Sequence, residues 1–232
     1  MGWLDTVASK GAQKLLIEDL KRGKTDEQKK VIDFFLLEQG CISGCVSGCL
    51  GRKQISLMEY NQMVANRLNG LNLRERAIEK IGLDESEIEE IPPIVMNGFC
   101  FLDDDAYIKI EDDTAVASRF AVSWIFFSAT QIYTYTYKFD MTSDDVWETT
   151  RDFFYQDITS FTTEQKIVER IDKHLVGCIR KGIEAQKHNY RVDTIQIVVP
   201  NDSYRFAMRN SGNLEQSIQA AKSMLRERKF VK

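Results

Sequence analysis

The chain has 232 residues, of which 43% are apolar and 28% are charged, and its formal net charge is −4. These proportions are ordinary for a globular protein, and three prolines are too few for a disordered, proline-rich chain. The acidic balance and the lack of a recognition motif argue against nucleic acid as a partner.

The charge is unevenly distributed along the chain. Residues 1–94 have 13 basic and 15 acidic side chains, residues 95–163 have 4 and 12, and residues 164–232 have 14 and 8. An acidic middle and a basic end on different faces would give the molecule a polarised field. We favour the simpler expectation that the two kinds of charge meet each other within one fold.

The compartment is predicted from the N-terminus and the cysteines. The start, MGWLDTVASKGAQKLL, has no uninterrupted apolar core and no small-residue cleavage site, so it does not resemble a signal peptide. Five cysteines, an odd number with three of them clustered, argue against a disulfide framework. We therefore expect a reducing, cytoplasmic environment, with membrane association as an alternative.

Residues 1–91 are predicted to be helical. Apolar residues recur at helical spacing in 3–22 and 26–40, and the second stretch has an acidic start. Ser56 and Glu59 have the spacing of a capping box, and Gly82 is a natural stop for the helix LRERAIEKIG. Two prolines at 92–93 then end the helical region, and we place a domain boundary there.

After the prolines the period changes to that of strands. Residues 94–113 predict two strands around an acidic turn, and residues 119–141 predict two more that turn between Ser128 and Gln131. In the last strand aromatic and polar residues alternate strictly, as expected of a half-buried antiparallel strand. Its largely aromatic face holds Tyr133, Tyr135, Tyr137, Phe139 and Met141, and its other face holds Ile132, Thr134, Thr136, Lys138 and Asp140.

The remaining elements are a further strand region at 146–163, strands at 194–200 and 204–209, and a C-terminal helix. Asn213 is a plausible cap for that helix, and Leu214, Ile218, Ala221 and Leu225 share one face. The segment 164–192 is ambiguous. Apolar residues every four positions from Ile167 favour a helix over 164–181, although two glycines would interrupt it.

Several antiparallel strands followed by one amphipathic helix resemble a pleckstrin-homology-like (PH-like) domain. The stretches WIFFSATQIYTYTYKFD, FFYQDITSF and IQIVVPNDSYRFAM, followed by LEQSIQAAKSMLRERK, resemble bacterial PH-like and GRAM-like domains. RERAIEKIGLDESEIEEIPPI resembles the lead-in of an uncharacterised bacterial family with this domain. The resemblance implies an α+β fold in which an antiparallel barrel of residues 95–232, with an insertion near 164–192, is closed by the C-terminal helix.

Such domains bind lipids, peptides or other proteins, and the fold alone does not say which. In phosphoinositide-binding members the first hairpin turn is typically basic. Here that turn contains Asp103, Asp104 and Asp105, which disfavours anionic lipid at this edge.

The stretch GCISGCVSGCLG, residues 40–51, raises its own question. Cys41, Cys45 and Cys49 would form one row on a helix, whereas a tetrahedral zinc site needs sulfurs that converge on one point. Gly40, Gly44 and Gly48 would each cost a helix about 1 kcal/mol. A close helix–helix contact or a flexible turn explains them most simply. A membrane contact is the alternative, and Asp33 and Glu38 oppose a transmembrane span.

Two charged clusters are candidate binding sites. The carboxylates at 103–105 and 111–113 could bind Ca²⁺, but their spacing does not match an EF-hand and a solvated turn is the simpler explanation. A basic cluster could meet phosphates or an acidic partner, although a solvated loop is again simpler. It consists of Arg180, Lys181, Lys187, His188 and Arg191.

No catalytic motif is found in the sequence. We therefore expect that the protein is not an enzyme and that it has no catalytic residues, bound metal or cofactor. The sequence favours a non-catalytic adaptor whose PH-like domain binds a protein or peptide along a sheet edge or groove, or associates with itself. The alternative is a peripheral membrane protein that contacts lipid through its glycine-rich helices.

Overall fold

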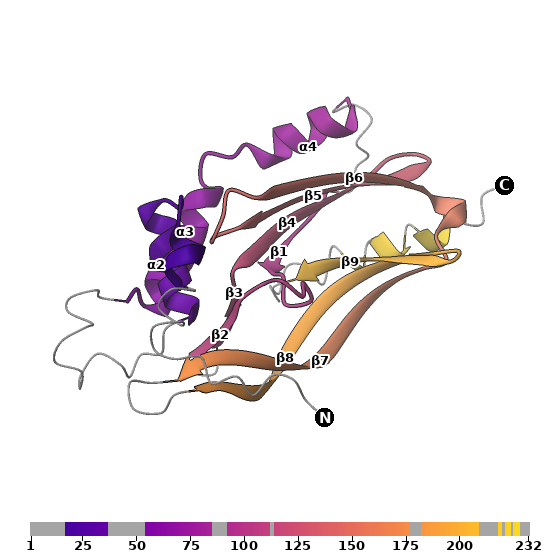
Figure 1. Ribbon diagram of the computed structural model, residues 1–232. Helices are drawn as coiled ribbons and strands as arrows, with labels where there is room; N and C mark the ends of the chain where they lie inside the picture. Colours follow the sequence, from indigo (N-terminus) through magenta and orange to yellow (C-terminus); the bar gives the residue numbers. More distant parts are fainter. Residues whose placement is uncertain are drawn as a thin grey trace.

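The computed structural model describes residues 17–36, 54–84, 92–111, 114–176 and 182–208, and short helical pieces at 218–219, 221–223 and 225–227. For residues 170–176, 182–188 and 190 it describes the backbone alone. The fold is α+β, with helices at the start of the chain and antiparallel sheets after them (Figure 1).

Three helices precede the sheets, namely α2 (Asp26–Leu36), α3 (Leu57–Leu68) and α4 (Leu73–Ile81). The predicted capping box of α3 is confirmed, because Ser56 and Glu59 each accept a hydrogen bond from the backbone of the other. The predicted stop of α4 is also confirmed, since Gly82 has the left-handed φ of 76° that glycine adopts without strain. Local capping signals therefore determine where α3 begins and where α4 ends.

The first sheet has four antiparallel strands in the order β1-β4-β5-β6. They are β1 (Ile94–Phe99), β4 (Arg119–Phe127), β5 (Gln131–Asp140) and β6 (Val146–Phe154). The predicted turn between β4 and β5 is confirmed, and the Ser128 hydroxyl and backbone N–H both donate to the Gln131 carbonyl. The β-branched and aromatic residues that fill these strands suit a pleated, packed surface.

The acidic turn does not join a hairpin. The two strands predicted around it exist, but β1 pairs with β4, whereas β2 (Ile108–Glu111) pairs with β3 (Thr114–Ala117). This small hairpin lies between β1 and β4 in the sequence. The strand pattern could place strands here but carries no information on their partners, which tertiary packing selects.

The expectation of a helix over 164–181 is wrong. Residues 164–176 belong to β7 (Ser160–Val176), which pairs in unbroken antiparallel register with β8 (Gly182–Val199), while 177–181 lie outside the described residues. The apolar residues that suggested a helix recur every four positions, and a spacing of four also keeps residues on one face of a strand. The sheet is completed by β9 (Asp202–Met208), which pairs with only the last part of β8, from Asp193 to Val199.

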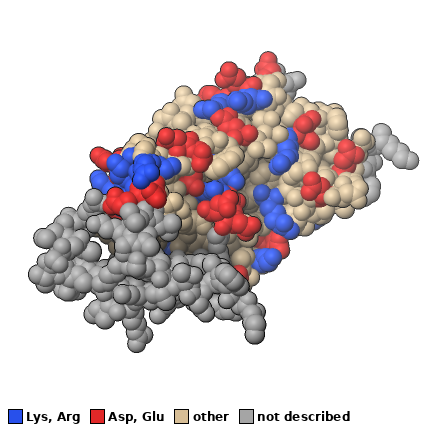
Figure 2. Space-filling model, viewed as in Figure 1, with Lys and Arg blue, Asp and Glu red and all other residues tan. Residues whose placement is uncertain are grey.

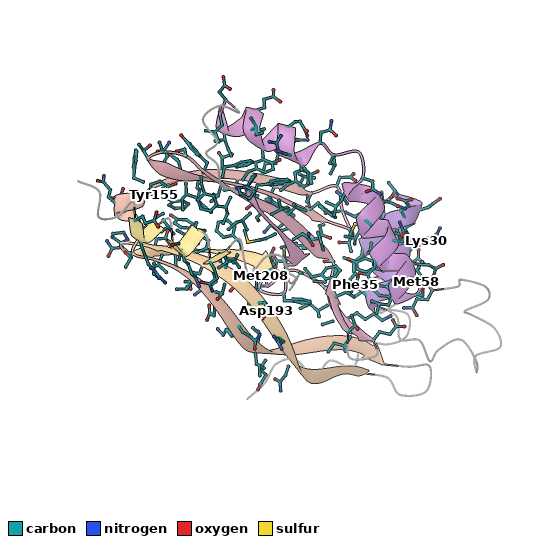
Figure 3. The ribbon with its side chains drawn as sticks, turned by 180° about the vertical axis from the view of Figure 1, so that it is seen from behind. Lys30, Phe35, Met58, Tyr155, Asp193 and Met208 are labelled. Carbon is teal, nitrogen blue, oxygen red and sulfur yellow. The ribbon has the colours of Figure 1, made fainter. Side chains whose placement is uncertain are left out.

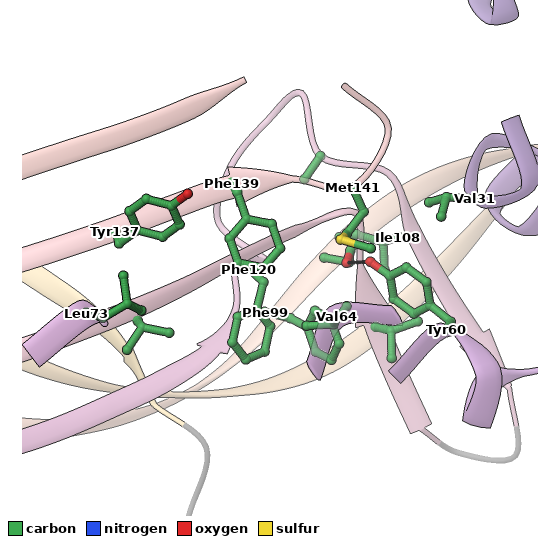
Figure 4. Close-up of a cluster of buried hydrophobic side chains, with 14 of the residues drawn as sticks. Val31, Tyr60, Val64, Leu73, Phe99, Ile108, Phe120, Tyr137, Phe139 and Met141 are labelled. Atoms are coloured by element: carbon green, nitrogen blue, oxygen red, sulfur yellow. Dashed lines mark hydrogen bonds between the residues drawn. The ribbon is translucent and has the colours of Figure 1, made fainter. Parts of the chain in front are cut away.

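The helices and the first sheet share one buried cluster (Figure 4). Tyr60 of α3 is fully buried and stacks on Phe34 of α2, with ring centroids 4.9 Å apart. Val64 and Leu73 bring α3 and α4 against Phe99, Phe120 and Phe139 of the sheet. The outer face of the sheet is therefore covered by helices.

The inner face of the same sheet belongs to a second cluster. Ile125, Ile132 and Phe153 of the first sheet meet Ile195 and Phe206 of the second. Residues of the helical pieces join them, since Ile218 and Ala221 are buried in this cluster. Figure 1 shows these pieces in yellow between the two sheets.

The prediction that β5 is half-buried understates its burial. On its aromatic face Tyr135 and Phe139 are fully buried, and on its polar face Ile132 is fully buried while Thr134 is 2% exposed. Both faces are covered because helices pack on one side and the second sheet packs on the other. The two kinds of residue still alternate along β5, but both of its faces are buried. One face packs against the helices and the other against the second sheet.

Acidic and basic side chains are interspersed over the face shown in Figure 2. Among the described residues, ion pairs form both between and within the three segments of different net charge. Arg76 of α4 pairs with Glu148 of β6, which joins residues 1–94 to residues 95–163, whereas Arg205 of β9 lies 3.6 Å from Glu164 of β7 within residues 164–232. No ion pair among the described residues joins the acidic middle of the chain to its basic end, so the expectation that these two segments meet stays a prediction.

Candidate functional site

A groove of about 420 Å³ lies where the start of β7 faces the helical pieces near the C-terminus. Its strand side follows a short 3₁₀ turn, η2 (Tyr155–Asp157), which connects β6 to β7. Figure 3 labels Tyr155 beside the yellow helical pieces. The groove is lined by Tyr155, Ile158, Thr159, Ser160, Phe161, Lys222, Leu225 and Arg226.

The strand wall is held rigidly in place. The buried Tyr155 hydroxyl donates a hydrogen bond of 2.7 Å to the Ser128 carbonyl, which ties η2 to the β4–β5 turn. The Ile158 N–H closes the turn on the Tyr155 carbonyl, and the Thr159 N–H donates to the Val198 carbonyl of β8. Pairing of β7 with β8 therefore begins at the groove.

β7 is an edge strand. In the sheet order β7-β8-β9 it has β8 on one side, and no strand of the described part of the chain pairs with its other side. An edge strand presents main-chain N–H and C=O groups that another strand can pair with. Among the described residues, the groove therefore lies at the start of a strand with one edge that no other strand covers.

The helical wall has an apolar residue beside two basic ones. Leu225 is partly buried and packs against the inter-sheet cluster together with Ile158 and Phe161. Lys222 is partly exposed and Arg226 is exposed. Residues three and four apart share one face of a helix, so Lys222, Leu225 and Arg226 face the groove together.

A larger hollow, of about 790 Å³, runs along α4 from Gly70 to Lys80. Its cations are already engaged, because Arg76 and Lys80 both pair with Glu148 of β6. Burial raises the pKa of the neighbouring Tyr135 to about 12, and the Glu148 carboxylate adds to the effect. This arrangement holds α4 on the sheet and engages both cations of the hollow.

The acidic residues considered for Ca²⁺ serve the fold in part. Asp103 accepts from Lys138 at 2.8 Å and lies 3.5 Å from Arg119. Asp104 and Asp105 are exposed, while 112–113 lie outside the described residues. In the part of the chain that the structure describes, no three metal-ligating side chains lie close enough together to hold an ion.

Little of the predicted basic cluster can be placed. Arg191 is exposed and lies 3.6 Å from Asp193. Residues 180–181 lie outside the described residues, and for 187–188 the backbone alone is described. The proposal that this cluster meets an anion stays a prediction.

The glycine and cysteine stretch 40–51 also lies outside the described residues, as does Cys178. Cys100 is a buried free thiol, and burial raises its pKa to about 12. None of the helices within the described ranges is both long and apolar enough to cross a membrane.

Sequence reasoning missed the groove. FFYQDITSF contributes to the resemblance, and Leu225 belongs to the apolar face of a predicted helix, but no local pattern connects the two. One signal was available: Lys222 and Arg226 flank Leu225 on a helix face expected to be apolar. Comparison of the chain with models of protein families, with curated proteins and with solved structures finds no match.

Proposed function

We propose that this protein is a non-catalytic cytoplasmic adaptor in which residues 95–232 form a PH-like domain. The domain binds an extended segment of a partner protein beside β7, in the groove between that strand and the C-terminal helix. The observation that carries the proposal is the coincidence of an edge strand with a side-chain groove along it.

The order of the elements supports the PH-like part of the proposal. A four-stranded antiparallel sheet is followed through η2 by a three-stranded one, and helical pieces then pack between them. The sheets approach each other at Gly98 of β1, where a Cβ added to the glycine would lie 3.5 Å from the Ala207 Cβ of β9. Two additions distinguish the chain from a minimal domain, the β2–β3 hairpin and the long outer part of β7–β8.

The chemistry of the groove supports binding rather than catalysis. Its described lining offers hydroxyl groups, apolar side chains and two cations. Main-chain pairing along β7 would supply affinity with little sequence preference, and the groove would select side chains.

The test is selection of binding peptides from a displayed random library on the full-length chain. Thr159 is exposed and lines the groove, so Thr159→Trp should fill it without disturbing the core. We expect selected peptides to bind the wild-type chain and to lose at least tenfold in affinity with Thr159→Trp. Thr149→Trp, at an exposed position of β6, is the matched control and should bind as the wild type does.

Peptides that bind Thr159→Trp as tightly as the wild type would contradict the proposal, because their site would then lie elsewhere. The membrane alternative rests on residues 40–51 and stays a prediction. Sedimentation with liposomes tests it independently of the groove.

A further inference from the structure

The charged side chains of the groove are both cations. Lys222 and Arg226 lie on its helical wall, and no carboxylate is among the described residues that line it. Within the described part of the chain neither side chain has an ion-pair partner, whereas Arg76 and Lys80 of the α4 hollow share Glu148. The groove thus holds two cations with no ion-pair partner among the described residues, in a chain whose net charge is −4.

The cations lie beside an apolar surface. Leu225 lies between them in the sequence and contacts the same cluster as the buried Ile158 and Phe161 on the opposite wall. A ligand in the groove would therefore meet two neighbouring positive charges with an apolar surface beside them.

The spacing of the cations suits a strand. Four residues of helix rise about 6 Å, and two residues of strand rise about 6.8 Å. Side chains two apart in an extended segment point to the same face. A strand that follows the helix could thus place two carboxylates opposite Lys222 and Arg226.

We infer that the groove selects an acidic segment. Resting on the proposed function, this inference gives the partner as an extended peptide with two acidic side chains two residues apart and an aliphatic side chain on the same face. The aliphatic side chain packs on Leu225, and the carboxylates pair with Lys222 and Arg226. Main-chain pairing with β7 holds the backbone.

The experiment measures fluorescence anisotropy of labelled decapeptides with the full-length chain at low salt. The acidic probe is GSETETLTSG, and the basic control probe is GSKTKTLTSG. We expect the wild type to bind the acidic probe at least tenfold more tightly than the basic one. The preference should shrink at high salt, because exposed charges are screened.

Charge reversal provides the sharpest comparison. The double variant Lys222→Glu/Arg226→Glu should reverse the preference and bind the basic probe more tightly. Arg22→Glu/Lys30→Glu changes the net charge equally at exposed positions away from β7 and the groove, and it should keep the wild-type preference. If reversal destabilises the helix end, Lys222→Gln/Arg226→Gln should still abolish the preference.

The outcomes separate the two proposals. If both probes bind the wild type equally and neither binds Thr159→Trp, the preference for an acidic segment is overturned. The proposal that the groove binds an extended segment then stands. A preference for the acidic probe that Thr159→Trp does not weaken would place the site elsewhere and overturn both. Failure of the wild type to bind either probe at millimolar concentration would overturn the inferred preference for an acidic segment. The peptides selected from the library would still test whether the groove is the binding site.

Discussion

The hydroxyl of Tyr60 donates a hydrogen bond of 2.6 Å to the backbone carbonyl of Ala117 (Figure 4). Tyr60 lies on α3 and Ala117 on β3, 57 positions further along the chain. Both residues are fully buried. The bond therefore joins the helical region to the inserted hairpin inside the core, where water cannot replace it.

Tyr60→Phe should lower the free energy of unfolding by about 1–3 kcal/mol, because the buried Ala117 carbonyl loses its donor while the packing of the ring is kept. Urea denaturation measures the change. Met58→Ala is the control on the same helix, since Met58 is 78% exposed, and it should change stability by less than about 0.5 kcal/mol. Equal effects of the two variants would show that the hydrogen bond contributes nothing.

Stability should fall at alkaline pH. Burial, aided by Asp140, raises the pKa of Tyr60 well above 10, and burial with Glu148 raises the pKa of Tyr135 to about 12. Above pH 10 the unfolded chain loses phenol protons that the folded chain keeps, so the unfolded state gains relative stability. The stabilisation is complete below pH 10 and is lost as the pH rises through the folded-state pKa values.

The measurement compares the free energy of unfolding at pH 8 and pH 11 in the wild type and in Tyr60→Phe/Tyr135→Phe. The double variant removes these two titrations and should show a smaller decline. An identical decline in both proteins would assign the effect to other groups.

Cys100 should resist alkylation. The thiolate is the reactive form, and burial, with a contribution from Asp103, raises the pKa of this thiol to about 12. At pH 8 iodoacetamide should leave Cys100 unmodified in the folded protein and modify it in urea. Peptide mass spectrometry distinguishes Cys100 from the other four cysteines, and equal rates with and without urea would contradict its burial.

The ion pair between Arg76 and Glu148 should contribute modestly. Burial opposes the charged form of Glu148, but hydrogen bonds from Arg76 and Lys80 outweigh it and lower the pKa of the carboxyl group. Because the Arg76 side chain is 44% exposed, we expect a coupling energy of at most about 1 kcal/mol at neutral pH. A double-mutant cycle of Arg76→Gln and Glu148→Gln measures it.

The same cycle gives a pH test. A carboxyl group with a lowered folded-state pKa stabilises the fold above its unfolded-state pKa, near 4.5, and loses that contribution as the pH falls through the folded-state value. The coupling should therefore shrink in acid and also in high salt. A coupling that is unchanged by both would indicate packing of the Arg76 stem on Tyr137, whose ring centroid lies 5.5 Å from the guanidinium carbon.

Short-range signals in the sequence predicted the parts of the fold that depend on neighbours in the chain. The Ser56–Glu59 capping box and the glycine at 82 act within one helical turn, and both are confirmed. The turn at Ser128 is likewise confirmed, because four residues are enough to close it. For such features the physical cause lies inside the sequence window that reveals it.

The segment 164–181, for which we expected a helix, shows a limit of prediction from local sequence patterns. An apolar spacing of four fits one face of a helix and one face of a strand equally, and pairing of β7 with β8 decides between them. The groove illustrates the same limit at longer range. Ile158 and Leu225 come together only because both sheets and the helical pieces share one cluster.

The α+β class, the change from helices to strands after the prolines at 92–93 and several element ends follow from the sequence alone, since hydrogen bonds and side-chain alternation act between near neighbours. The strand partners, the burial of both faces of β5 and the position of Lys222 and Arg226 opposite an edge strand emerge only when the chain is folded. These depend on apolar surface buried between segments far apart in the chain, which no local pattern encodes.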